Sequence, residues 1–365
     1  MGMTKRKRSM ECELQEEARR ILEAAVADGS ENSLQFCVYR NGECIIDAWA
    51  GWTDFAHTRP VDVHTIFPIY STSKGVPAAA LTRLIAQGRL SPETPVAELW
   101  PEFAKNGKER TLIRHFLNHT SGLHQRFPEQ QIYEQVADWP YMIHVIEESA
   151  PDWEPGTQTR YQSLTYGWVT AEVIRRVTGK SFRDYVAEEL FGPEGIEDFY
   201  FGTTDAAERN AAEIRCEPGV KSVRTISVCD PLDDLMRQPC IRRAALPGFN
   251  AIASAHGLAK FYHAILNERY FSRRTLLEAT TLNRPEPELP SVSGFMTFGY
   301  GFALSGPIDD VGRVFGHGGY GGSDGLADHD ANLAVGFTAG KLGEHPCKAE
   351  LYRLIGLVQR KNWLP

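Results

Sequence analysis

Ser71 and Lys74 form the segment of this chain with the clearest potential for chemistry. They follow an apolar run, residues 66–70, at the expected start of a helix. Residues three apart share a helix face, so the Lys74 amine can reach the Ser71 hydroxyl. A lysine whose pKa is lowered by burial can remove the proton that keeps a serine hydroxyl a poor nucleophile. The S-x-x-K pattern therefore predicts an acyl-transfer nucleophile with its base beside it, although one chance match is expected in a chain of about this length.

Two other segments carry groups that such a site needs. Tyr161 follows the turn 153–156 and precedes an expected helix, and a tyrosine near a cationic lysine ionises more readily and exchanges protons. Residues 315–322 hold closely spaced glycines, which let the backbone approach a ligand and offer N–H groups to an oxyanion. The structural alternatives are a tyrosine packed at a helix entrance and a tight connection between strands.

The pattern of elements predicts an α/β (α+β) fold. Residues 14–26 have helical periodicity, and two strands over 34–38 and 45–49 flank Asn41-Gly42, a strong hairpin signal. Strands return near the end of the chain. The expected helices cover 71–87, 112–118, 165–178, 182–190, 252–267 and 347–359, and the late strands 298–304, 312–316, 325–328 and 333–339. We expect an antiparallel sheet built from both termini, over about 30–70 and 295–365, with a helical region inserted over about 71–290.

Composition excludes several classes of protein. The chain has 365 residues and a net charge of −8, from 39 basic and 47 acidic residues, which argues against a nucleic-acid partner. No segment approaches the roughly 20 apolar residues of a membrane span. The basic run 5–8 is followed by glutamates where a signal peptide would be apolar, so we expect a disordered tail over 1–12 and a single domain over 13–365. Seven scattered cysteines indicate reduced thiols and a cytoplasmic location.

The order of the three segments resembles that of the serine β-lactamase and penicillin-binding-protein superfamily, which has S-x-x-K, then Y-x-N, then K-T-G. The similarity is strongest to class C β-lactamases and family VIII carboxylesterases. Three further stretches support it: Leu117-Asn118-His119-Thr120-Ser121-Gly122-Leu123, Trp153-Glu154-Pro155-Gly156 and Gly316-His317-Gly318-Gly319-Tyr320-Gly321-Gly322-Ser323. The resemblance spans about residues 30–360 and implies a β-lactamase/transpeptidase-like fold.

The resemblance implies a role for each residue of the motifs. Ser71 would be acylated, Lys74 would be its base, and Tyr161 would pass protons to the leaving group and help to activate the deacylating water. The N–H groups of Ser71 and Tyr320 would form the oxyanion hole. The substrate-binding position would include Gly319, His317 and Ser163.

The chain departs from the family pattern at the positions that bind β-lactams. Ser163 replaces the asparagine of Y-x-N, and His317 and Gly318 replace the lysine and threonine of K-T-G. Histidine is mostly neutral near pH 7, so a fixed cation for the lactam carboxylate is missing. These departures favour an ester substrate. A smaller departure is Pro77, which removes one hydrogen bond from the expected helix.

Other patterns offer competing sites. Residues 321–325 spell G-x-S-x-G around Ser323, but the following sequence indicates a turn and a strand where a nucleophile elbow needs a helix. His115 and His119 have metal-ligand spacing without the glutamate of H-E-x-x-H, so we expect structural histidines. His329 is expected in a solvated turn. We expect no cofactor and no metal.

Three functions remain open at this point. The first is a serine hydrolase that acts through an acyl-enzyme, a carboxylesterase on small acyl esters. The second is a β-lactamase or D-amino-acid peptidase, and the third is a scaffold or filament-forming member of the superfamily without catalysis. The expected partner is a small-molecule ester or amide, with no nucleic acid and no membrane, and with a possible homo-oligomer.

Overall fold

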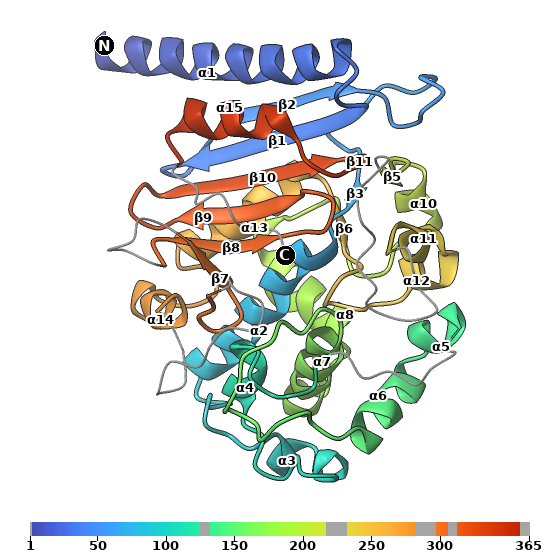
Figure 1. The fold of residues 1–365 in the computed structure, drawn as a ribbon. Helices are drawn as coiled ribbons and strands as arrows, with labels where there is room; N and C mark the ends of the chain where they lie inside the picture. Colours follow the sequence, from blue (N-terminus) through green and yellow to red (C-terminus); the bar gives the residue numbers. More distant parts are fainter. Residues whose placement is uncertain (1, 125–131, 217–231, 282–296, 306–311, 358–365) are drawn as a thin grey trace.

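A six-stranded antiparallel sheet dominates the upper part of the molecule in Figure 1. The computed structural model describes residues 2–124, 132–216, 232–281, 297–305 and 312–357. The strand order is β2-β1-β10-β9-β8-β7. The strands are β1 (Ser33–Arg40), β2 (Glu43–Gly51), β7 (Ala303–Ser305), β8 (Val314–Gly318), β9 (Asp324–Asp328) and β10 (Leu333–Ala339). The expected sheet from both ends of the chain is confirmed, because β1 pairs directly with β10.

The hairpin between β1 and β2 turns at the predicted dipeptide. Asn41 and Gly42 have φ angles of +49° and +90°, which these two residues tolerate better than others. The strands run antiparallel from Ser33↔Gly51 to Arg40↔Glu43, with one register shift beside Val38.

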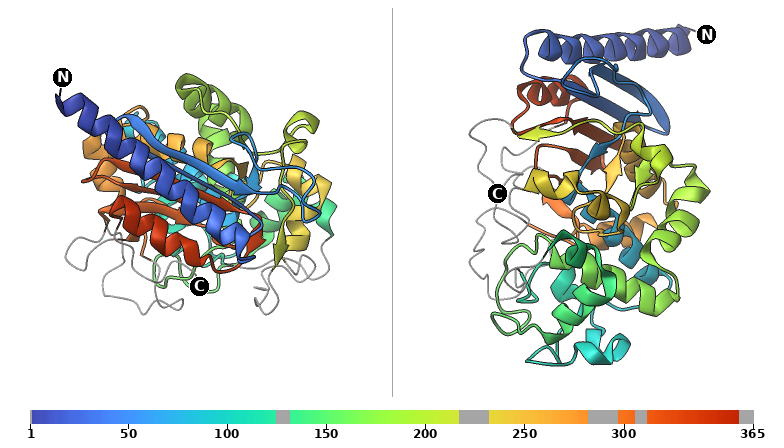
Figure 2. Two further views of the ribbon diagram at one scale, coloured as in Figure 1. Left: turned by 90° about the horizontal axis from the view of Figure 1, so that it is seen from above. Right: turned by 90° about the vertical axis from the view of Figure 1, so that its right-hand side faces the viewer.

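Helices cover both faces of this sheet. On one face lie α1 (Gly2–Ala27) and α15 (Pro346–Ile355), side by side in the view from above in Figure 2. On the other face lies α13 (Ala255–Leu266). Alternate strand residues face each layer, so Phe36 and Val335 are buried under α1 and α15, while Cys37 packs against α13. The central strands of the sheet are therefore buried on both faces, while the edge strand β2 stays partly exposed.

The expected disordered tail over 1–12 is wrong for most of its length, because α1 already begins at Gly2. The segment from Met3 to Ala27 contains neither glycine nor proline and is rich in Lys, Arg and Glu, which favour a helix. The charged run therefore extends the amphipathic helix that was expected over 14–26.

The middle of the chain forms the helical region, as predicted. Its helices are α2 (Gly75–Ala86), α3 (Val96–Leu99), α4 (Ile113–Leu117), α5 (Tyr133–Ala137), α6 (Trp139–Glu148), α7 (Thr165–Thr178), α8 (Phe182–Val186), α9 (Gly192–Glu194), α10 (Asp205–Glu208), α11 (Leu232–Arg237), α12 (Pro239–Arg243) and α14 (Arg273–Ala279). Shorter helical turns are η1 (Tyr70–Lys74), η2 (Pro101–Phe103) and η3 (Ala187–Phe191). In the described part of the chain, no helix is both long and apolar enough to cross a bilayer.

Two small sheets were not expected from the sequence. One joins β3 (Phe67–Pro68), β6 (Ile252–Ala253) and β4 (Phe199–Tyr200), and the other pairs β11 (Lys341–Leu342) with β5 (Arg215–Cys216). Strands of two residues leave no periodicity to detect. β6 takes the first two residues of the helix expected over 252–267, and its pairing with β3 positions the chain just before Ser71.

Candidate active site

Ser71 lies in a short 3-10 turn that precedes α2. The turn η1 spans Tyr70–Lys74, and α2 continues from Gly75. Pro77 falls in the first turn of α2, where a missing N–H is tolerated. Tyr70 has a φ of +46°, a left-handed conformation that is rare for a bulky residue and costs energy. This strained residue directly precedes the candidate nucleophile.

The backbone before Ser71 is held on two sides. The Ile69 amide donates to the Ala251 carbonyl at 3.0 Å, which continues the β3–β6 pairing. The Ile69 carbonyl accepts from the Ser323 hydroxyl at 2.9 Å. Ser71 itself stays partly exposed, so its hydroxyl is held in place yet open to a substrate.

The Lys74 amine is buried and has three oxygen neighbours. Its side chain is fully buried, and Nζ lies 3.2 Å from the Ser71 Oγ. Nζ also donates to the carbonyls of Ser163 at 2.7 Å and Gly248 at 2.5 Å. A neutral amine has two N–H donors and one lone pair. In the neutral form, with both N–H groups donated to the carbonyls, the lone pair would be left for the Ser71 hydroxyl, which is what a general base requires.

Burial also favours the neutral form of this amine. Desolvation lowers the pKa of Lys74 well below the ordinary 10.5. None of its polar neighbours described here is a carboxylate that would offset this shift. The sequence-based expectation that Lys74 has a lowered pKa is therefore supported by a physical cause.

Tyr161 faces the same amine. The Lys74 Nζ lies 5.0 Å from the centre of the Tyr161 ring, and the tyrosine hydroxyl lies 3.4 Å from the His317 Nε2. The expectation that Tyr161 ionises more readily is wrong. Burial raises the pKa of Tyr161, and a hydrogen bond with Ser71 offsets only part of that rise. At neutral pH this tyrosine is a protonated phenol that can donate and relay protons.

His317 is a neutral acceptor in this arrangement. Its side chain is buried, and Nδ1 lies 2.6 Å from the Gly318 carbonyl. A carbonyl only accepts, so Nδ1 carries the proton and Nε2 presents its lone pair to the Tyr161 hydroxyl. Burial, together with the charge of Lys74, lowers the pKa of His317 to about 3.

The glycine-rich segment lies directly against the Ser71 turn. A Cβ added to Gly319 would lie 2.3 Å from the Ile69 carbonyl oxygen and 2.2 Å from the Ser323 Oγ, so only glycine fits there. The next residue, Tyr320, places its ring edge-on against Tyr70, with centroids 5.5 Å apart. The predicted residues Gly319 and Tyr320 are thus brought beside the η1 turn that holds Ser71.

Ser163 approaches the site through its main chain. Its carbonyl, and not its hydroxyl, contacts Lys74. Sequence reasoning missed two neighbours of the amine: the Gly248 carbonyl and the Tyr166 ring, which lies 5.9 Å from Nζ. The ring of His119, which was expected to be a structural histidine, lies 4.9 Å from that of Tyr161. A carbonyl ligand leaves no signal in residue type, so the sequence gives no reason to single out Gly248.

The structure also places the competing candidates from the sequence, which are Ser323, His115, His119 and His329. Ser323 is buried, and β9 begins directly after it at Asp324, where a nucleophile elbow would continue as a helix. The spacing of His115 and His119 does not give a metal pair, because His119 lies beyond α4 with a φ of +59°. His115 and His119 each accept a backbone N–H through Nδ1, from Leu112 at 3.2 Å and from Gln162 at 3.1 Å. His329 pairs with the neighbouring Asp330 at 2.9 Å in the turn after β9.

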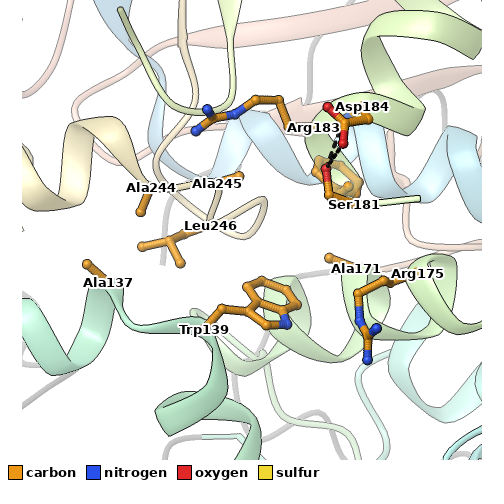
Figure 3. Close-up of a pocket in the computed structure, with 11 residues that line it drawn as sticks. Ala137, Trp139, Ala171, Arg175, Ser181, Arg183, Asp184, Ala244, Ala245 and Leu246 are labelled. Atoms are coloured by element: carbon orange, nitrogen blue, oxygen red, sulfur yellow. Dashed lines mark hydrogen bonds between the residues drawn. The ribbon is translucent and has the colours of Figure 1, made fainter. Parts of the chain in front are cut away.

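A separate pocket of about 420 Å³ opens in the helical region, and Figure 3 shows the side chains around it. Trp139 faces the segment Ala244–Leu246 across the space, and Ser181 donates to Asp184 at its edge. None of Ser71, Lys74 and Tyr161 lines this pocket. Gly248, which holds the Lys74 amine, lies two residues after Leu246, so one loop borders both places.

Known proteins share this fold and part of this sequence. The chain is 29% identical over 336 residues to the esterase/beta-lactamase LipL of Mycobacterium tuberculosis, with 84% of this chain and 76% of that protein covered. A family VIII carboxylesterase structure superposes with a TM-score of 0.84 at 28% identity, over 93% of this chain and 96% of that one. A penicillin-binding-protein homologue from Caulobacter crescentus gives a TM-score of 0.80 at 26% identity, over 93% and 95% of the two chains.

The family model described as Beta-lactamase matches residues 18–360 of the chain. That match includes the sheet, the inserted helical region and the three segments around Ser71. Fold, relatives and family model agree with the resemblance drawn from the motifs, so this chain belongs to the Beta-lactamase family and is a hydrolase of the serine β-lactamase fold.

Proposed function

We propose that this chain is a carboxylesterase that cleaves small acyl esters through an acyl-enzyme on Ser71. The carrying observation is the Lys74 amine, which is buried without a carboxylate partner among its described contacts and lies 3.2 Å from the Ser71 hydroxyl. The relatives named esterase or carboxylesterase support an ester substrate.

Acylation follows from this geometry. Lys74 takes the Ser71 proton as the serine oxygen bonds to the ester carbonyl carbon, and the carbonyl electrons move onto its oxygen. The N–H groups of Ser71 and Tyr320 hold that oxyanion. The intermediate collapses, the bond to the alkoxide breaks, and the proton passes from Lys74 through the Tyr161 hydroxyl to the leaving oxygen. Water repeats the sequence on the acyl-enzyme and releases the acid and free Ser71.

The substrate-binding position suits a neutral ester better than a carboxylate-bearing lactam. His317 is buried and neutral at the position where the K-T-G motif of the β-lactamases has a lysine. Gly318 has no hydroxyl to replace the threonine of that motif. Arg243, a cation that would be an alternative partner for the lactam carboxylate, is paired with Asp205 at 2.6 Å. An ester without a carboxylate loses nothing from these changes.

Two further expectations belong to the proposal. Five described cysteines are free thiols, Cys12, Cys37, Cys44, Cys240 and Cys347, while Cys229 lies outside the described residues. Free thiols agree with a cytoplasmic location, which cell fractionation would test. A homo-oligomer also stays a prediction, and sedimentation would separate it from the 40.8 kDa monomer and from a filament.

A fluorophosphonate should label Ser71 and leave Ser323 unmodified. Ser71 is partly exposed beside its base, whereas the Ser323 hydroxyl is buried and donates to Ile69. Peptide mapping by mass spectrometry locates the adduct. Ser71→Ala should abolish labelling, and a label on Ser323 in the unmodified chain would contradict the proposal.

Lys74→Arg should lose ester turnover nearly as fully as Lys74→Ala. Arginine keeps the positive charge but does not give up a proton, so the general base is lost in both variants. We expect kcat/KM to fall by roughly 10²–10⁴-fold. Circular dichroism of both variants controls for folding, and a folded arginine variant with near-normal turnover would show that charge alone suffices.

The pH profile of kcat/KM should rise with pH and level off below pH 10.5. The neutral Lys74 amine is the active form, and burial lowers its pKa, so its loss of a proton produces the rising limb. His317, with its pKa near 3, stays neutral over this range and adds no limb. A profile measured with a neutral ester tests this. The limb should keep its position in His317→Asn, whatever the rate, and a limb that disappears there would assign it to the histidine.

The enzyme should prefer p-nitrophenyl butyrate to nitrocefin by orders of magnitude in kcat/KM. Each charge-assisted hydrogen bond that a lactam fails to make costs about 1.5–3 kcal/mol, and about 1.4 kcal/mol corresponds to a factor of ten. Ser71→Ala serves as the blank for both substrates. Comparable kcat/KM values for the two would favour the β-lactamase alternative.

A further inference from the structure

Four potential metal ligands meet outside the serine site, between the first hairpin and α13. They are Cys37 on β1, Cys44 and Asp47 on β2, and His256 in the first turn of α13. Their ligand atoms all lie within 4.8 Å of one another. Figure 1 shows the strands and the helix that carry them.

A bulge in β2 brings the second cysteine into this group. Cys37 pairs directly with Asp47, so these two side chains share the face that looks at α13. In a regular strand, Cys44 would point to the opposite face, together with Ile46. The register jumps from Val38↔Ile46 to Tyr39↔Cys44, which leaves Ile45 as an extra residue. The extra residue turns Cys44 to the Asp47 face, as bulges commonly re-aim a side chain.

We propose that Cys37, Cys44, Asp47 and His256 form a tetrahedral site for a divalent thiophilic cation, with zinc as the natural occupant. Two thiolates, one imidazole and one carboxylate make a ligand set that zinc prefers. The proposal departs from the sequence-based expectation of no metal. His256 is 209 residues from Asp47, and the cysteine spacing matches no metal motif.

Two of the distances between the ligand atoms match those of a tetrahedron around one ion. Zinc–sulfur bonds of about 2.3 Å at tetrahedral angles place two sulfurs about 3.8 Å apart. The Sγ atoms of Cys37 and Cys44 lie 3.8 Å apart. The Cys37 Sγ lies 3.9 Å from the His256 Nδ1, where the same geometry requires about 3.6 Å.

The distance between the His256 and Asp47 ligand atoms is shorter than a bound metal ion would give. The His256 Nδ1 and the Asp47 Oδ2 lie 2.7 Å apart because a proton joins them. A cation would replace that proton and open the pair to about 3.3 Å. Metal uptake therefore releases this proton and those of the two thiols.

The surroundings of the cluster also suit a metal site. The His256 Nε2 lies 3.2 Å from the Tyr39 hydroxyl, so the second ring nitrogen has the partner that orients a ligating histidine. Gln15 on α1 binds both the amide and the carbonyl of Asp47, at 2.7 and 3.0 Å, and so fixes its backbone. Cys44 is exposed, and the His256 and Asp47 side chains are 32% and 30% exposed, which leaves an entry path for an ion.

Cobalt(II) is the probe, because tetrahedral cobalt bound to thiolates has intense visible and near-ultraviolet absorption whereas zinc is silent. The full chain, reduced and free of metal, is titrated anaerobically with Co²⁺, and the complex is then titrated with Zn²⁺. We expect one cobalt per chain with tetrahedral thiolate bands, and displacement of the cobalt by zinc.

Variants separate this site from adventitious binding. Cys44→Ser and His256→Gln should weaken cobalt binding by at least about a hundredfold, and Tyr39→Phe by about 10–100-fold. Cys44 is preferred to the buried Cys37 because its replacement spares the core. The matched controls are Cys12→Ser, an exposed thiol on α1, and His64→Gln, from another His–Asp pair at 2.8 Å; both should bind cobalt normally.

Absence of the thiolate bands at millimolar Co²⁺ would overturn the proposal, as would bands that persist in both ligand variants. A Cys37–Cys44 disulfide that re-forms after reduction, combined with no cobalt uptake by the reduced chain, would also overturn it and identify a redox pair. Bands that require both Cys44 and His256 but neither control residue would establish the site.

Discussion

Burial of the Lys74 amine is the constraint on which the rest of the proposed active site depends. A charged ammonium is costly in a dry environment unless it is paired. Here two carbonyls, from Ser163 and Gly248, satisfy two donors and leave the Ser71 hydroxyl at the third position. The carbonyls fix the direction of the amine, and desolvation sets its protonation state. Both are needed for a lysine to act as a base near neutral pH.

Contacts from the glycine-rich segment hold the turn around Ser71 in place. Ser323 links the glycine-rich segment to the Ile69 carbonyl, and Gly319 allows the two backbones to approach. The same desolvation that lowers the pKa of Lys74 raises that of Tyr161 and keeps His317 neutral. Desolvation therefore favours the neutral form of all three groups. The cation that forms when Lys74 takes the Ser71 proton lasts only until that proton reaches the leaving oxygen, which suits acyl transfer to and from an uncharged ester.

The group of Cys37, Cys44, Asp47 and His256 differs from the serine site in its exposure to solvent. Cys37 is buried, while Cys44, Asp47 and His256 reach the surface, so that group is open to ions from solvent. It joins the β1–β2 hairpin to α13, whose preceding strand β6 pairs with β3 just before Ser71. The two sites thus lie on connected elements, although no residue belongs to both.

The sequence by itself determined the motif order, the terminal sheet, α7 and the choice of Ser71 and Lys74, because side-chain spacing and periodicity carry that information. It also anticipated that Ser323 lies before a strand. Only the tertiary structure decided the rest. The Gly248 carbonyl reaches Lys74 from 174 residues away, and main-chain contacts of that kind have no residue signature. The raised pKa of Tyr161 follows from burial that no local pattern encodes. The face of the sheet to which Cys44 points depends on a one-residue bulge in β2. The position of His256 beside the two cysteines depends on how α13 packs on the sheet.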